Sequence, residues 1–154
     1  MIYLNDIHDA LEGMISAKYP GAPVYHDVLP KDFNRPSFYV EMTEFTFSPE
    51  DGTPSSIMRQ AVFKIVAFVA IDAYHNGQVS ELDTRLDVLA GLFAPGFLRV
   101  GDRAPHAVIR KGEIVSTDAA QLTIALEWWE DLDDFAGIEP VTAPDLEHVE
   151  IAQQ

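Results

Sequence analysis

Two long alternating segments decide the fold: SFYVEMTEFTFS at residues 37–48 and IMRQAVFKIVAFVAID at residues 57–72. Apolar residues alternate through the first half of the first segment, which predicts a half-buried strand. Their parity changes at Glu44, which indicates a β-bulge or a strand that projects beyond the domain body. The second segment is apolar on both faces at its far end, as in a central strand. A polar loop joins the two segments, so we predict a long antiparallel hairpin.

Helical patterns flank this hairpin on both sides. Apolar residues recur at helical spacing from Leu4 to Ile15, with Asn5 as the expected N-cap, and again from Gln78 to Phe93. Shorter strands are predicted at residues 24–28, 97–100, 107–110 and 121–130. The order helix, strands, helix, strands predicts an α+β fold in which two helices pack on one face of a mostly antiparallel sheet.

Length and composition indicate a single domain. The chain has 154 residues, of which 47% are hydrophobic, and it contains no cysteine. We assign residues 1–132 to the α+β domain and residues 133–154 to a flexible acidic C-terminal extension, because the latter are poor in apolar residues. No apolar run is long enough to cross a membrane and no secretory signal pattern opens the chain. We therefore expect assembly inside a cell, without a membrane partner.

Charge excludes one class of partner. Ten basic residues against 25 acidic ones give a formal net charge of −15, and no Lys or Arg follows Lys111. Binding to a phosphate backbone needs a clustered positive surface, so we expect no sequence-specific binding to nucleic acid. The acidic surface either serves solubility or avoids or imitates nucleic acid.

The candidate metal ligands do not form a recognised pattern. His8 and His26 each precede an aspartate, but neighbouring side chains point in different directions on a helix or a strand. Asp72 and His75 flank a turn, yet no second ligand pair stands at a metal-binding spacing. We therefore predict no metal and no cofactor.

Catalytic motifs are also missing from the sequence. It has no nucleophile elbow and no phosphate-binding glycine loop. The acidic pair Glu130-Asp131 is expected on a solvated edge, where a raised pKa would not arise. We predict no catalytic residue and no enzymatic activity.

Aromatic residues indicate an interaction surface instead. Trp128 and Trp129 are adjacent, so on a strand they face opposite ways, and the outer one either meets a protein partner or lies under a helix. We take as candidates for a protein interface Phe45, Phe47, Met58, Arg59, Trp129, Asp131 and Phe135.

The order of these elements resembles the tail terminator proteins of long-tailed bacteriophages and related prophage particles. The resemblance covers roughly residues 1–132. It depends on the opening LNDIHDAL (4–11), on FNRPSFYV (33–40), on the long strand ending in IDAY (71–74), and on LTIALEWW (122–129).

The resemblance implies a virion protein that assembles in the host cytoplasm. It would form a ring, expected to be hexameric, on the head-proximal end of the tail tube, with the tube, the neck and, in contractile particles, the sheath as partners. A ring built from one repeated contact needs two complementary surfaces, for which we take residues 44–58 and 129–154. The alternatives are another neck or head-completion protein and an acidic inhibitor that imitates DNA.

Overall fold

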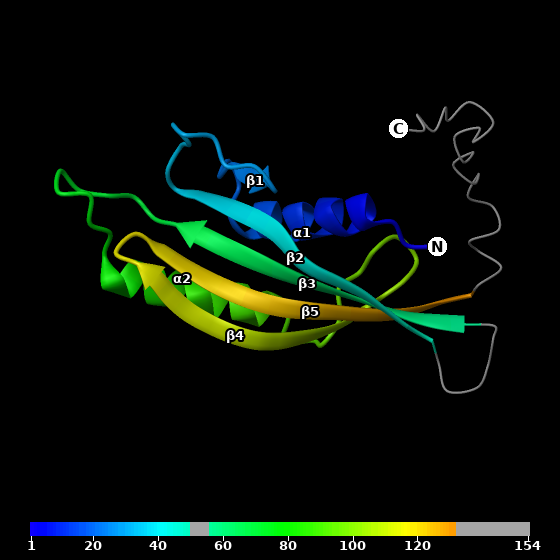
Figure 1. The fold of residues 1–154 in the computed structure, drawn as a ribbon. Coiled ribbons are helices and arrows are strands. Elements are labelled where there is room, and N and C mark those ends of the chain that lie inside the picture. Colours follow the sequence, from blue (N-terminus) through cyan, green and yellow to red (C-terminus); the bar gives the residue numbers. More distant parts are fainter. Residues whose placement is uncertain (50–55, 132–154) are drawn as a thin grey trace, which may run out of the picture.

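The computed structural model describes residues 1–49 and 56–131 of the chain. Within them, a five-stranded sheet carries both helices on one face (Figure 1). Along the chain the elements are α1 (Leu4–Lys18), β1 (Val24–His26), β2 (Ser37–Pro49), β3 (Ser56–Phe68), α2 (Val79–Leu92), β4 (His106–Ser116) and β5 (Ala119–Asp131). The strand order is β1-β2-β3-β5-β4, and all neighbours are antiparallel except β1 and β2. The predicted α+β fold is confirmed.

The predicted hairpin is also present. β2 and β3 pair from Ser37 with Phe68 to Pro49 with Ile57, and the register shifts between Met42 and Glu44, where the sequence pattern changes parity. That shift is a bulge, and it confirms the first of the two alternatives. β3 ends at Phe68 rather than at Asp72, because neither β2 nor β5 extends far enough to pair with the residues that follow.

Other local predictions are wrong as well. Tyr3, not Asn5, caps α1: its backbone is extended, and its N–H donates to the Asp6 carboxylate at 3.3 Å. Residues 97–100 form only isolated bridges, Phe97 with His106 and Val100 with Arg103. β4 and β5 are longer than predicted, since each supplies the hydrogen bonds of the other. The acidic extension at residues 133–154 lies outside the described residues.

The hydrophobic core lies between the sheet and the helices. Alternate residues of the three central strands face the helices and are fully buried, among them Phe38, Phe63 and Ile124. α1 and α2 cover them with one apolar stripe each, which includes Leu11 and Leu89. Each large apolar side chain buried in this way stabilises the fold by roughly 1.5–3 kcal/mol.

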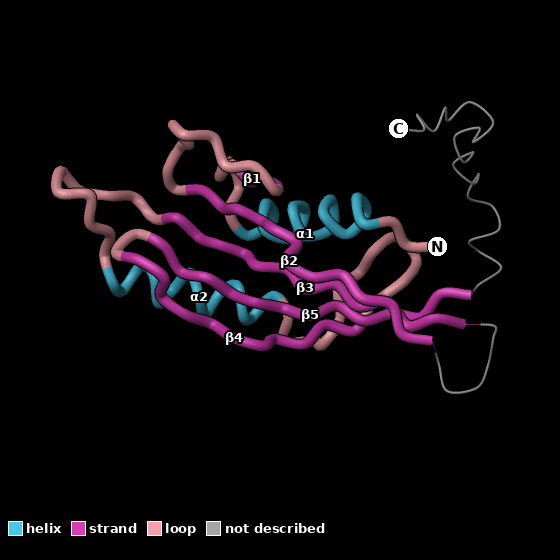
Figure 2. The backbone as a smooth tube through the Cα atoms, in the orientation of Figure 1, coloured by secondary structure: helices cyan, strands magenta, loops and turns pink. Residues whose placement is uncertain are grey.

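The opposite face of the sheet is open, in that no described helix lies on it (Figure 2). It carries polar and apolar residues: Gln60 on β3 donates to Glu127 on β5 at 2.6 Å, Glu41 on β2 stands opposite Lys64 on β3, and Val62 on β3 pairs with Ala125 on β5. The exposed side chains of this face, such as Trp129, are available to partners.

Candidate assembly surface

Near the β2–β3 hairpin the sheet extends past both helices (Figures 1 and 2). We call this region the projecting end and define it as residues 44–49 of β2, 56–60 of β3 and 127–131 of β5. The bulge at residues 42–44 stands at its base. Six of the seven predicted interface residues fall in or next to it; Phe135 lies outside the described residues.

On the helix side of the projecting end, Arg59 is enclosed by aromatic rings. Its guanidinium carbon lies 4.9 Å from the ring centre of Phe45, 5.5 Å from that of Phe47 and 5.2 Å from that of Trp128. Its Nη1 also donates to the carbonyl oxygen of Ile2 at 2.9 Å. Only 7% of Arg59 is exposed, so most of its side chain packs inside the fold.

Glu130 is a buried anion beside Arg59. Its carboxylate accepts hydrogen bonds from the N–H of Ile2 at 2.6 Å, from the indole N–H of Trp128 at 3.0 Å and from Arg103 at 2.6 Å. Burial by itself raises the pKa of Glu130, but the N–H of Ile2 and the guanidinium of Arg103 lower it by more, so the net shift is downward. Glu130 is therefore charged at neutral pH.

This network is the main feature that the sequence interpretation missed. Glu130 was expected on a solvated edge, and that expectation is wrong for Glu130, although Asp131 is exposed. The signal was weak: Glu130 has the same parity as the buried Leu126 and Trp128, but its partners come from Ile2 and Arg103, far away in the sequence.

The projecting end also exposes apolar side chains. Phe47 is 50% exposed on the helix side, and Trp129 is 45% exposed on the open face, opposite the buried Trp128. Met58 stands directly across from Trp129 in the β3–β5 register. Trp129 borders a pocket of about 430 Å³, which is also lined by Met58, His106 and Glu127. Large apolar groups exposed beside polar ones are typical of protein contacts.

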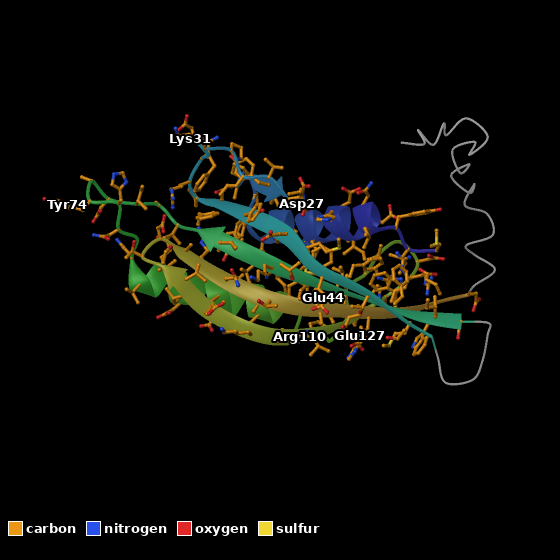
Figure 3. All side chains as sticks on the ribbon, in the orientation of Figure 1. Asp27, Lys31, Glu44, Tyr74, Arg110 and Glu127 are labelled. Carbon is orange, nitrogen blue, oxygen red and sulfur yellow. The ribbon has the colours of Figure 1, made fainter. Side chains whose placement is uncertain are left out.

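The register changes how the two predicted contacts relate. The hairpin residues and Trp129 were assigned to two separate surfaces. Met58 and Trp129 lie side by side on the open face, whereas Phe45 and Phe47 lie on the helix side of the same projecting end. A different apolar area lies at the opposite end of the sheet, near the loop that bears Tyr74 (Figure 3). There Val79, Ile114 and Val115 are 45–70% exposed around a pocket of about 580 Å³.

The structure shows no arrangement typical of an enzyme or a metal site within the residues it describes. Asp72 Oδ1 accepts hydrogen bonds from the N–H groups of Tyr74 and Asn76, which explains its place beside a turn without a metal. No three potential ligands gather around one point in residues 1–49 and 56–131. Neither described helix is long and apolar enough to span a membrane.

Comparison with known proteins gives the identity of the chain. A family model described as "Phage tail terminator protein" matches residues 6–133, close to the span over which the sequence shows its resemblance. A search of curated proteins finds no match. The match covers most of the chain and defines a structural protein of bacteriophage tails. More narrowly, the chain belongs to the phage tail terminator protein family. It is thus a virion component that associates with other parts of the phage particle.

Proposed function

We propose that the protein forms a ring on the head-proximal end of the tail tube, ends tube polymerisation there and provides the docking surface for the neck of the head. The observation that supports this most is the projecting end, which exposes Phe47 and Trp129 beyond the cover of the helices. Protein assembly is a use for such a surface that agrees with the family.

Closure of a ring requires complementary subunit contacts besides the tube contact, and therefore a surface away from the projecting end. The exposed apolar area around Val79, Ile114 and Val115 meets two requirements for it. It lies at the other end of the sheet, so one subunit can use both surfaces at once. Its pocket is also lined by uncharged residues only, which matters because copies with a net charge of −15 repel each other. We assign the projecting end to the tube and this apolar area to one half of the contact between neighbouring subunits, whose complementary half is a further surface of the subunit.

Negative-stain microscopy of lysates from a particle with this gene disrupted tests the proposal. Tubes of variable, excessive length without heads are the expected result, because nothing would then stop polymerisation. Tubes of normal length that fail to join heads would instead identify a neck protein. Fully normal particles would contradict both and favour the acidic inhibitor.

The two surfaces are separated by a pair of variants. Val79→Asp is expected to prevent ring formation by the purified protein while leaving its fold intact, since Val79 is 70% exposed. Trp129→Ala is expected to leave ring formation intact and to prevent binding to tubes. Deletion of residues 135–154 tests whether the acidic extension, with Phe135, contributes to either contact. If Val79→Asp instead prevented tube binding and Trp129→Ala prevented ring formation, the subunit contact and the tube contact would be exchanged.

A further inference from the structure

Four ionisable side chains that are apart in the sequence meet between α1 and the short strand β1. His8 Nδ1 lies 3.1 Å from His26 Nδ1, His26 Nε2 lies 2.7 Å from the Glu12 carboxylate, and His8 Nε2 lies 3.6 Å from the Asp27 carboxylate. The side chains of His8 and His26 are 13% and 26% exposed. None of these contacts belongs to the projecting end.

The hydrogen bonds among these four side chains determine which ring nitrogens carry a proton. A carboxylate can only accept, so His26 Nε2 carries a proton and donates it to Glu12. In the neutral ring, Nδ1 of His26 is then an acceptor, and His8 must donate from its own Nδ1. One additional proton fits on His8 Nε2, where it faces Asp27. A second additional proton does not fit, because it places two N–H groups against each other.

Asp27 connects this series of contacts to the sheet at the base of the projecting end. Asp27 has a left-handed backbone, with φ of 55°, which is uncommon outside glycine. Two hydrogen bonds hold this conformation. The N–H of Asp27 donates to the carbonyl oxygen of Val40 at 3.0 Å, and the hydroxyl of Tyr39 donates to the carbonyl oxygen of Asp27 at 3.1 Å. Its carboxylate accepts from the N–H of Met42 at 3.4 Å, and Met42 is the residue at which the bulge begins.

We propose that His8 and His26 form a proton-sensitive latch between α1 and the bulge of β2, closed while the pair holds at most one additional proton and opened when both imidazoles are protonated. Opening separates α1 from β1 and breaks the hydrogen bond from the N–H of Met42 to the Asp27 carboxylate. The proposal does not depend on the function proposed above.

The surrounding charges agree with a latch that is closed at neutral pH. Asp9 and Glu12 face the pair from α1, Asp27 faces it from the turn after β1, and β3 contributes only the ring of Phe63, 5.2 Å from that of His8. Glu41 and Lys64 lie on the open face, on the other side of the sheet. Burial is the largest effect and lowers the pKa of His8; Asp27 opposes this shift, and His26 adds to it.

Amide hydrogen exchange of the full chain between pH 7.5 and 5.0 tests the latch. Because the open form binds one more proton than the closed form, the opening constant of the α1 amides rises by up to tenfold per pH unit once the pH is below about 6.5. His8→Gln can turn its amide oxygen toward His26, so its closed form also accepts a protonated His26 and its opening constant is expected to stay flat. His106→Gln, at an exposed histidine on β4, is the matched control and keeps the wild-type slope.

Nitrogen-15 NMR of the imidazoles in the wild-type protein gives an independent measurement that needs no variant. At pH 7.5 we expect His8 protonated on Nδ1 and His26 on Nε2. Both rings protonated on Nε2 alone would overturn the proposal. So would a wild-type opening constant that does not change between pH 6 and 5, or a His8→Gln variant that keeps the wild-type slope.

Discussion

The helix-covered part of the sheet and the projecting end are stabilised by different interactions. Under the helices, apolar side chains such as Ile65 and Leu122 pack in one core with side chains of α1 and α2. Past the helices, the same sheet face is covered by Ile2, by a cation among aromatic rings and by a buried carboxylate. Past the end of the helices, the contacts of Arg59 and Glu130 therefore stabilise the sheet, and part of Phe47 stays exposed for a partner.

The largest effect is expected in the covered part. Phe63 is fully buried in the centre of β3, so Phe63→Ala leaves a cavity that its neighbours cannot fill. We expect a loss of about 3–5 kcal/mol in the free energy of unfolding, measured by urea denaturation. A loss below about 1 kcal/mol would show that the covered part does not depend on close packing.

The next largest effect is expected at Glu130. Glu130→Gln keeps the size of the side chain but leaves Arg103 without its anion, so we expect a loss of about 3 kcal/mol at pH 7, again measured by urea denaturation. Glu44→Gln, at an exposed carboxylate on β2, is the matched control, because it makes the same change at a site outside the buried network. A loss as small as that of ordinary surface variants would mean that the network does not stabilise the projecting end.

The same residue predicts a dependence on pH. Because folding lowers the pKa of Glu130 below its ordinary value of 4.5, its charged form contributes stability above that pH. The contribution is lost as the pH falls through the lowered pKa, when the buried carboxylate takes up a proton. The wild-type protein should therefore lose more stability than Glu130→Gln between pH 5 and pH 3. Parallel curves would contradict the assignment.

The sequence predicts the covered part far better than the projecting end. Periodicity identifies both helices, the hairpin and the bulge after Met42, because each depends on the spacing of neighbouring apolar residues. The contacts of Glu130 with Ile2 and Arg103 depend on how distant segments meet, and no local pattern encodes that. The same holds for His8 and His26. Arg59 was predicted as an interface residue, but only the register shows that aromatic rings enclose it.

Arg59→Lys distinguishes charge from shape in the projecting end. Lysine keeps the positive charge near Glu130, but it lacks the flat guanidinium that packs against Phe45 and Trp128. We expect a loss of about 1–2 kcal/mol in the free energy of unfolding. Equal stability of the variant and the wild type would show that charge alone is sufficient there.

The smallest effect on stability is expected at Trp129, although its effect on assembly is expected to be the largest. Nearly half of this side chain is exposed, so Trp129→Ala should change the free energy of unfolding by about 1 kcal/mol or less. Binding to purified tail tubes, measured by co-sedimentation, should be lost, because an exposed aromatic side chain beside a pocket is the kind of group that dominates protein contacts.

The comparison between Trp129 and its neighbour tests the whole assignment. Trp128 is buried against Arg59 and Glu130, so Trp128→Ala should destabilise the protein by about 3–5 kcal/mol. Adjacent residues would then separate folding from assembly: one variant loses stability, and the other loses tube binding while remaining folded. If Trp129→Ala binds tubes as well as the wild type, the exposed face of the projecting end is not the tube contact, and Phe47 on the helix side becomes the residue to change.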